Sequence, residues 1–218
     1  MSKINVLDLF SGVGGLSIGF ENAGFNIVAG IDNDPYSLLT FSKNHPDSIA
    51  KNFDLAQKID FSSNELSALK NLKIDVLVGG PPCQGFSVAG KRSESDPRNI
   101  LYKSYLSFIE HFTPEVILIE NVPTMLSMYG GRIYHAINSE VKNLGYETSA
   151  FILDSSNYGI PQKRKRFFLI GTNSGKKINI PSISLTAKIT TRDALSDLPS
   201  LTNSLESKTY SSKPKNNY

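Results

Sequence analysis

The chain has almost no cysteine and no tryptophan: Cys83 is its single thiol in 218 residues. A single cysteine cannot form a disulfide within the chain, which excludes a small disulfide-stabilised fold. No apolar run approaches the roughly 20 residues that a membrane-spanning helix needs. The first residues also lack the charged and then apolar pattern of a secretory leader. We therefore expect a cytoplasmic protein that has no membrane partner.

The chain also has little net charge, because 23 Lys and Arg stand against 20 Asp and Glu, a formal balance of +3. With 39% hydrophobic and 20% charged residues, the composition is that of a globular protein and excludes a disordered or collagen-like chain. At roughly 150 residues per domain, the length allows one large domain or one domain with a partial second. So small a charge does not by itself indicate a polyanionic partner, and the placement of the basic residues matters more.

Short apolar runs alternate with helical stripes up to about residue 171. The stripes predict helices from about residue 16 to 23, over 100–112 and over 132–144, and the runs predict strands at 6–10, 25–31, 74–78, 116–119, 148–153 and 166–171. This alternation indicates an α/β fold with a mostly parallel central sheet and helices on both faces. Residues 201–218 are mainly Ser, Lys, Asn and Thr and hold too little apolar content to fold alone.

Residues with unusual chemistry collect where the predicted strands end, which is where open parallel sheets bind ligands. A glycine turn of Gly12, Gly14 and Gly15 follows the first strand, and Asp32 ends the second. Such a turn brings backbone N–H groups to a ligand at a helix N-terminus, and the acid can accept hydrogen bonds from a ribose. The pattern predicts an adenosine-containing cofactor, with a plain tight turn as the alternative. It lacks the third glycine of the dinucleotide fingerprint and the Lys-Ser/Thr of a phosphate loop, so nicotinamide cofactors and ATP fit less well.

Cys83 stands in the segment G-G-P-P-C-Q-G-F-S at a strand end. A lone cysteine is more often a small buried hydrophobe, but the rigid polar context suits a nucleophile. Glu120 follows four apolar residues, and a partly desolvated carboxyl suits a proton donor; the alternative is a solvated acid. We predict no metal site, because there is no second cysteine and the histidines are scattered. We expect His45, His111 and His135 on the surface or on a helix face.

A basic run, Q-K-R-K-R, precedes the last predicted strand. In an extended segment Arg164 and Arg166 share one face, which could point toward the site, while Lys163 and Lys165 point outward. The loop after the cysteine carries further basic residues, Lys91, Arg92 and Arg98. Together they would bring positive charge to the mouth of the pocket, as binding to a phosphate backbone requires; the alternative is a solvated edge.

Six short segments of the chain together resemble the motifs of a known family. They are D-L-F-S-G-V-G-G (8–15), I-D-N-D (31–34), D-L (54–55), G-G-P-P-C-Q-G-F-S (79–87), E-N-V-P (120–123) and Y-G-I-P-Q-K-R-K-R (158–166). In this order, over about residues 4–171, the chain resembles the catalytic part of the DNA (cytosine-5)-methyltransferases. DNA enzymes that methylate amino groups end the fourth strand in Pro-Pro-Tyr or Pro-Pro-Phe and need no thiol, so Cys83 speaks against them.

The resemblance implies a Rossmann-like, S-adenosylmethionine-dependent methyltransferase fold and a role for each catalytic residue. Carbon 5 of cytosine is a poor nucleophile, so the Cys83 thiolate would first add to carbon 6. Glu120 would hydrogen-bond or protonate ring nitrogen 3, and Arg164 would hold the base carbonyl. Asn121 and Pro82 would shape the cysteine loop.

The resemblance also implies the binding residues. S-adenosyl-L-methionine would be held by Phe10, Gly12, Gly14, Gly15, Asp32, Asn33, Asp54, Leu55 and Pro81. Double-stranded DNA would be contacted by Gln84, Ser87, Lys91, Arg92, Arg98 and Arg166. The target cytosine must be flipped out of the stack, and the loop from Gln84 to Arg98 would close over it. Where the family often has an aromatic residue to stack on adenine, this chain has Asn33, so another apolar residue must supply that face.

Members of this family continue into a target-recognition domain, an Arg-Glu segment and a Gly-Asn-x-Val-Pro segment, none of which stands before Tyr218. T-T-R-D-A-L-S-D-L-P (190–199) resembles the linker that leads into that part. We therefore expect a catalytic and cofactor-binding domain at 1–180 and a linker at 181–218, in one half of a split enzyme, a truncated product or an excised fragment. A second polypeptide could supply the rest. The first interpretation is the modification enzyme of a restriction-modification system, or one subunit of it; the alternatives are a non-catalytic remnant and a tRNA cytosine-5 methyltransferase.

Overall fold

The computed structural model describes residues 3–82, 100–181 and 188–198. The chain forms two compact units, Met1–Phe151 with Phe167–Asn179, and Ile152–Arg166 with Ile180–Tyr218. No helix within the described ranges is long and apolar enough to cross a membrane.

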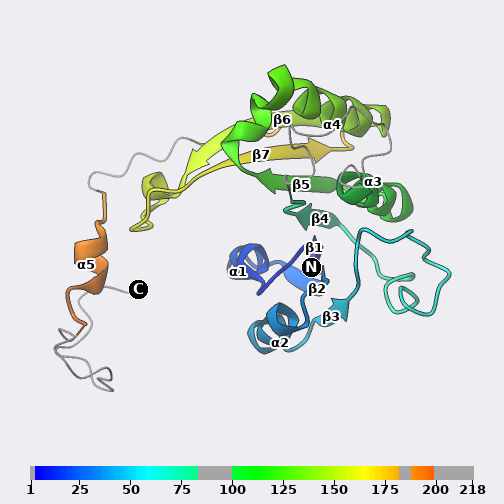
Figure 1. Ribbon diagram of the computed structural model, residues 1–218, viewed down its shortest axis with the longest axis horizontal. Helices are drawn as coiled ribbons and strands as arrows, with labels where there is room; N and C mark the ends of the chain where they lie inside the picture. Colours follow the sequence, from blue (N-terminus) through cyan, green and yellow to red (C-terminus); the bar gives the residue numbers. More distant parts are fainter. Residues whose placement is uncertain (1–2, 83–99, 182–187, 199–218) are drawn as a thin grey trace. The chain divides into compact units, whose positions relative to one another are not determined.

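A seven-stranded sheet runs in the order β3-β2-β1-β4-β5-β7-β6 (Figure 1). Strands β1 to β5 pair parallel to their neighbours, and β7 pairs antiparallel with β5. The predicted α/β fold with a mostly parallel sheet is therefore confirmed. The strands are β1 (Asn5–Leu9), β2 (Asn26–Asp32), β3 (Ile49–Asn52), β4 (Val76–Gly79), β5 (Val116–Asn121), β6 (Glu147–Asp154) and β7 (Lys165–Thr172).

Alternate residues of the strands feed two apolar cores. Leu7 and Leu77 belong to one core, which takes in Phe108 of α3 (Ile100–Phe112) and Ile137 of α4 (Arg132–Asn143). The neighbouring Val6 belongs to the other core, with residues of α1 (Gly15–Asn22) and α2 (Pro35–Asn44). Because successive side chains of a strand point to opposite faces, two cores mean that helices cover both faces of the sheet, as the sequence predicted.

The helices begin where the sequence places their start signals. Asp34 caps α2 by accepting hydrogen bonds from the N–H groups of Tyr36 and Ser37, with Pro35 at the first helical position. Gly14 precedes α1 in a left-handed conformation, with φ of 87°. Two short 3-10 turns, Pro123–Leu126 and Met128–Gly131, lead from β5 into α4.

The sheet reverses its strand order between β1 and β4. From β1 the chain builds β2 and then β3 on one side, and it returns to β4 and β5 on the other. Ligands of open α/β sheets bind outside the carboxyl ends of the strands at such a point. The fold therefore brings the end of β1, which carries the glycine turn, beside the end of β4, which leads to Pro81 and Pro82.

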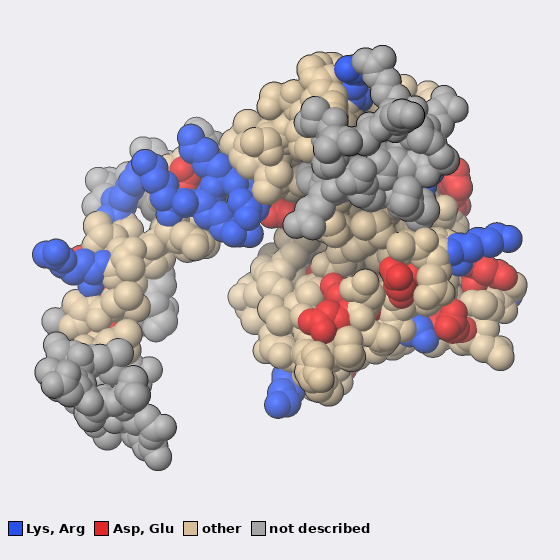
Figure 2. All heavy atoms as spheres, in the orientation of Figure 1, with Lys and Arg blue, Asp and Glu red and all other residues tan. Residues whose placement is uncertain are grey.

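The second unit contains the last three residues of β6, the first two residues of β7, a 3-10 turn (Ser155–Tyr158) and the short helix α5 (Thr191–Leu195). Thr190 and Asp193 form a capping box at the start of α5, and the Thr191 hydroxyl donates to the Pro161 carbonyl at 3.2 Å. Lys and Arg gather on this unit, as the blue spheres of Figure 2 show. Its described residues hold six Lys and Arg against three Asp, whereas those of the first unit hold 11 against 14 Asp and Glu.

Candidate active site

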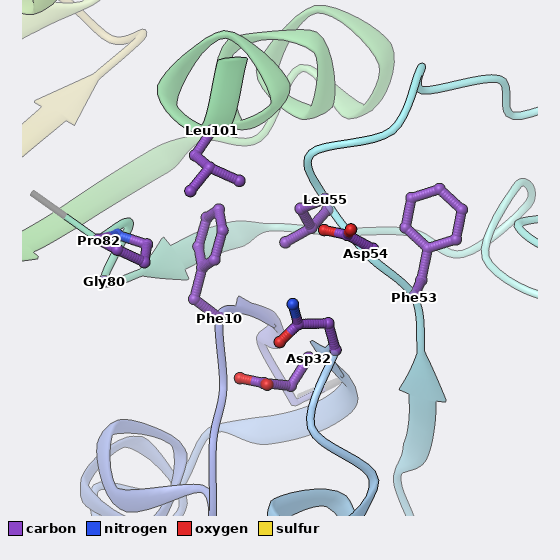
Figure 3. Close-up of a pocket in the computed structure, with 9 residues that line it drawn as sticks. Phe10, Asp32, Phe53, Asp54, Leu55, Gly80, Pro82 and Leu101 are labelled. Carbon is purple, nitrogen blue, oxygen red and sulfur yellow. The ribbon is translucent and has the colours of Figure 1, made fainter. Parts of the chain in front are cut away.

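A pocket of about 240 Å³ lies in the first unit at the carboxyl ends of the strands (Figure 3). Its walls come from the ends of β1, β2 and β4, the segment after β3, and the start of α3. The lining residues are Phe10, Asp32, Asn33, Phe53, Asp54, Leu55, Gly80, Pro82 and Leu101. Five of the nine residues predicted to bind the cofactor thus meet in one pocket, and Pro82 joins them from the predicted catalytic set.

The pocket has an apolar side and an acidic side. In Figure 3 the Phe10 ring points toward Leu101, with Leu55 beside it, while Asp32 lies on the opposite side. Phe10 adopts an unusual left-handed conformation, with φ of 60°, which only the surrounding contacts can hold in place. Because Asn33 is exposed, the apolar face that the sequence analysis required comes from Phe10, Leu55 and Leu101 instead.

Asp32 joins the glycine turn to β2. Its Oδ2 accepts a hydrogen bond from the Gly12 N–H at 2.8 Å, and its Oδ1 accepts one from the Asp34 N–H at 2.9 Å. A carboxylate has about four lone-pair positions, so acceptor capacity is left for the hydroxyls of a ribose. Gly12, Gly14 and Gly15 do not line the pocket themselves; they form the turn that carries the chain from Phe10 into α1.

Asp54 supplies a second carboxylate on the far side of β2. It is half-buried, and its Oδ1 accepts the Ala56 N–H at 2.9 Å, which fixes the side chain in a local turn. The Ser104 hydroxyl of α3 donates to the Leu55 carbonyl at 2.5 Å and so ties this segment to the helix above it. The segment after β3 is therefore held in place by its own turn and by α3.

The end of β5 meets the segment that leaves β4. The Asn121 side-chain N–H donates to the Pro81 carbonyl at 2.9 Å, and its own oxygen accepts the Val122 N–H at 2.8 Å. A methyl group added to Gly80 would lie 3.3 Å from Glu120 Oε2. The Glu120 carboxylate therefore lies against Gly80, which is part of the pocket wall, and Asn121 holds the proline segment that precedes the cysteine. The roles of Glu120 and Asn121 in the reaction stay predictions.

Other predicted residues lie elsewhere. The residues Cys83, Gln84, Ser87, Lys91, Arg92 and Arg98 lie outside the described part of the chain. Arg164 and Arg166 belong to the second unit; Arg164 is exposed, and Arg166 is half-buried and donates to the Lys165 carbonyl at 2.8 Å. The sequence analysis missed Phe53, Gly80 and Leu101 in the pocket wall. Phe53 adjoins the D-L segment and Gly80 lies within the G-G-P-P-C-Q-G-F-S segment, which was the available signal, and Leu101 is on the stripe of the predicted helix 100–112.

Two buried polar side chains lie behind the glycine turn. His45 is only 1% exposed, so the expectation of a surface histidine is wrong for this residue; it holds for His111 and His135, which are exposed. The ring of His45 fills the space that Gly14 leaves between α1 and the end of α2. Asp8, also 1% exposed, accepts the Ser17 hydroxyl at 2.6 Å, and burial raises the pKa of its carboxyl to about 7 although this hydrogen bond opposes the shift.

Comparison with known proteins agrees with this geometry. The sequence model of the C-5 cytosine-specific DNA methylases matches residues 4–218. The Type II methyltransferase M.AgeI of Thalassovita gelatinovora is 36% identical over 219 residues, which cover 90% of this chain and 51% of that protein. M.AquIA of Picosynechococcus, also a Type II methyltransferase, is 34% identical over 185 residues, which cover 81% of this chain and 75% of that protein.

A solved structure is similar as well. A prophage-encoded E. coli protein described as a DNA modification methyltransferase superposes with a TM-score of 0.75 at 32% identity, over 91% of this chain and 56% of that one. The chain spans about half the length of the first curated relatives that it matches. Since the family model covers nearly the whole chain, the protein belongs to the C-5 cytosine-specific DNA methylase family.

Proposed function

We propose that this chain transfers a methyl group from S-adenosylmethionine to carbon 5 of cytosine in DNA, as the modification enzyme of a restriction-modification system or as one subunit of it. The observation that carries the proposal is the pocket at the switch point of the sheet. It joins an apolar wall to two carboxylates and lies against Glu120. The Type II methyltransferases among the relatives support the choice of DNA as substrate and of restriction-modification as context.

The residues of the pocket fit the proposed cofactor. Phe10, Leu55 and Leu101 offer the apolar surface that an adenine ring needs, and Asp32 has acceptor capacity for ribose hydroxyls. The turn at Gly12 to Gly15 leads to the N-terminus of α1, where backbone N–H groups favour a carboxylate. When bound, the cofactor supplies an electrophilic methyl group.

The chain's own residues would make carbon 5 of cytosine reactive. The Cys83 thiolate adds to carbon 6, and a proton held by Glu120 at ring nitrogen 3 offsets the negative charge that this addition creates. Arg164 hydrogen-bonds the base carbonyl. After methylation, carbon 5 gives its proton to water, the thiolate leaves carbon 6, and the proton at ring nitrogen 3 returns to Glu120, which restores the aromatic ring and the free enzyme.

Glu120 and Asn121 would couple the two halves of the site. The Glu120 carboxylate borders Gly80 in the pocket wall, so the base would lie next to the cofactor. Asn121 fixes the Pro81 carbonyl, two residues before Cys83, and we assign it a positioning role for the thiol. A reaction between two bound groups depends on such fixed placement.

The second unit would contact the phosphate backbone of DNA. Its described residues carry an excess of positive charge, and Lys163, Arg164 and Lys165 are exposed. Its acids are engaged locally: Asp154 accepts the N–H and hydroxyl of Ser156, and Asp193 caps α5. Exposed lysines and arginines are the residues that neutralise DNA phosphates.

A partner polypeptide would supply target recognition. The chain covers 51% of M.AgeI but 75% of M.AquIA, so a Type II methyltransferase chain of comparable length is among its relatives. A tRNA methyltransferase stays the second candidate only through a likeness to Dnmt2 structures at 23% identity, which shows the fold alone.

The test is incorporation of label from methyl-labelled S-adenosylmethionine into unmethylated DNA. We expect incorporation at carbon 5 of cytosine by the chain combined with the polypeptide that carries the recognition domain. Cys83→Ser should abolish incorporation and leave cofactor binding intact, because serine cannot supply a thiolate. Incorporation into tRNA instead of DNA, or retained turnover by Cys83→Ser, would reject the proposal. Cofactor binding without incorporation in any combination would identify a non-catalytic remnant.

A further inference from the structure

The segment from Phe10 to Gly15, here called the cofactor turn, is held from one side by β2. The Ser11 N–H donates to the Ile31 carbonyl at 3.0 Å, and the Gly12 N–H donates to Asp32 at 2.8 Å. These bonds fix the first half of the turn. The second half, Val13 and Gly14, takes no bond from β2 among those that the described structure shows.

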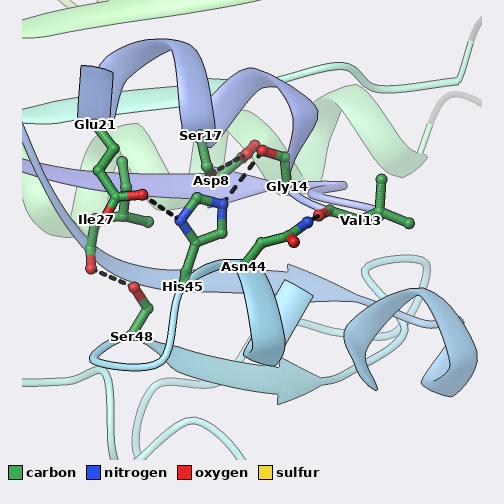
Figure 4. Close-up of polar contacts among 9 residues, drawn as sticks. All are labelled: Asp8, Val13, Gly14, Ser17, Glu21, Ile27, Asn44, His45 and Ser48. Carbon is green, nitrogen blue, oxygen red and sulfur yellow. Dashed lines mark hydrogen bonds and ion pairs between the residues drawn. The ribbon is translucent and has the colours of Figure 1, made fainter. Parts of the chain in front are cut away.

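The second half of the cofactor turn is held instead by the last residues of α2 (Figure 4). The Asn44 side chain donates to the Val13 carbonyl at 2.8 Å. The next residue, His45, places its Nε2 3.3 Å from the Gly14 carbonyl. The last residue of α2 and the residue that follows it thus contact two consecutive carbonyls of the turn.

His45 is fixed in this position by its other contacts. Its side chain is 0% exposed, its Nδ1 lies 2.9 Å from Glu21 Oε2, and its ring packs on Phe41 at a centroid distance of 4.7 Å. A methyl group on Gly14 would lie 2.5 Å from His45 Nε2, so the ring fills the space beneath the glycine. Nδ1 faces the Glu21 carboxylate of α1 and Nε2 faces the Gly14 carbonyl, so the ring lies between an oxygen of the helix and an oxygen of the turn.

The Gly14 carbonyl is also the first acceptor of helix α1. It takes the Ile18 N–H at 2.9 Å, which closes the first turn of the helix. A displacement of this carbonyl would therefore move the start of α1 together with the turn. It would also disturb the left-handed conformations of Gly12 and Gly14, with φ of 53° and 87°, which carry the chain away from Phe10 in the pocket wall.

We propose that His45 is a positioning residue for cofactor binding: through the Gly14 carbonyl it holds the cofactor turn and the N-terminus of α1 in the conformation that binds S-adenosylmethionine. The inference rests on the proposed function for the identity of the ligand, but the contact itself belongs to the protein alone. Asn44 acts with His45 on the neighbouring carbonyl.

A matched pair of substitutions separates the contact of Nε2 with Gly14 from the contact of Nδ1 with Glu21. In His45→Gln the side-chain amide nitrogen takes the position of Nε2 and can still donate to Gly14. In His45→Asn the amide nitrogen takes the position of Nδ1 and can reach only toward Glu21. Both variants lose the aromatic ring and its packing on Phe41. His135→Asn serves as the control, because His135 is an exposed residue of α4.

The experiment measures S-adenosylmethionine binding to the full chain by calorimetry, and amide hydrogen exchange over residues 12–18 without ligand. For His45→Asn we expect Kd to rise about tenfold, the effect of one lost hydrogen bond, and exchange in the turn to accelerate. His45→Gln should stay within about twofold of the wild type in both measurements. Asn44→Ala should resemble His45→Asn, and the control should bind like the wild type.

Equal affinity and equal exchange in His45→Gln and His45→Asn, whether both are intact or both impaired, would overturn the positioning role. If the wild type itself does not bind S-adenosylmethionine, the cofactor assignment of the proposed function fails. Hydrogen exchange without ligand then tests the role of His45 independently of the cofactor. Faster exchange in His45→Asn than in His45→Gln supports the contact, and identical rates overturn it.

Discussion

The two units of the chain differ in what holds them together and in the charge they carry. Every buried apolar side chain of the described residues lies in the first unit, which has more acids than bases. The described residues of the second unit have twice as many bases as acids, and about half of the surface of Ile152, Ile160 and Leu195 is exposed. A small cofactor demands fixed walls, which close packing provides, whereas a phosphate backbone demands mobile surface charge. We infer that cofactor binding and DNA binding are divided between the units.

The largest expected effect is on the packing of the first unit. A methyl group on Gly79 would lie 2.7 Å from the Leu9 carbonyl oxygen and 3.1 Å from the Tyr105 ring, between the two central strands. Backbone atoms of paired strands cannot yield, so Gly79→Ala should lower the free energy of unfolding by about 3 kcal/mol. Urea denaturation measures it.

Gly19→Ala is the control for that substitution. Gly19 is an exposed residue inside α1, and a methyl group there meets no atom within 4 Å. Alanine is the better helix former, so this variant should gain about 0.5–1 kcal/mol. If both variants unfold at the wild-type midpoint, the space around Gly79 is no more closely packed than the space around the exposed Gly19, and the expectation is wrong.

The two units should also differ in the pH range over which their stability changes. Burial raises the pKa of Asp8 in the first unit from 3.8 to about 7, so between these values the folded protein holds a proton that the unfolded chain has lost. Stability from this group therefore falls as pH rises through that window and is constant above it. In the second unit, hydrogen bonds from Ser156 lower the pKa of the exposed Asp154 carboxyl, and those from Thr190 lower that of Asp193. Their contribution is lost only as pH falls below the usual range of a carboxyl.

Asp8→Asn tests whether the buried Asp8 carboxyl makes the first unit less stable as pH rises. Relative to the wild type, the variant should gain roughly 2 kcal/mol of stability between pH 5 and pH 8, because it has no proton to lose in that window. Unfolding in urea at both pH values gives the difference. A constant difference between variant and wild type would show that Asp8 does not change its charge there.

The sequence predicted the parts of the site that depend on strand ends. Asp32, Asp54 and the glycine turn could be placed together because the carboxyl ends of parallel strands meet at one edge of the sheet. Strand β3 has no apolar run, since I-A-K-N at the edge of the sheet is only partly buried, so its register could not be foreseen. Leu101 is in the pocket only because α3 packs above the strand ends, which no local pattern records.

His45 shows a second limit of the sequence. A histidine at the end of a helix, just before Pro46, has the appearance of a surface residue. It is buried because Gly14, 31 residues earlier in the chain, leaves room for its ring and offers a carbonyl. The division into units is likewise invisible, since its borders at 151/152 and 166/167 fall within β6 and β7 and depend on contacts across the fold.

Charge reversal in the second unit should weaken DNA binding and leave stability and cofactor binding unchanged. Lys163 and Lys165 are exposed, and replacing both with Glu should weaken binding to duplex DNA about tenfold at low salt and reduce the salt dependence of log K by about 2. Unfolding and S-adenosylmethionine affinity should stay at wild-type values. Salt titration of DNA binding by fluorescence anisotropy measures the change.

The matched control reverses two neighbouring lysines of the first unit, Lys176 and Lys177. Lys177 lies 3.7 Å from Glu147, and an exposed pair of this kind contributes little to stability. If this double variant loses as much DNA affinity as the pair in the second unit, binding follows the net charge of the chain, and the proposed division of labour between the units is wrong.

The smallest expected effect concerns the cap of α5 in the second unit. The Thr190 hydroxyl and backbone N–H both engage Asp193, at 2.7 and 2.8 Å, and Asp193 N–H donates back to the hydroxyl at 3.2 Å. Thr190→Ala removes the hydroxyl from both of its contacts, which should cost about 0.5–1 kcal/mol within the helix. Because this helix has only five residues and no buried side chain, the loss should stay local: faster amide exchange at Asp193 and Ala194, with an unchanged urea midpoint for the first unit. A shift of that midpoint would show that the two units unfold together, and the comparison between them would then describe one cooperative structure.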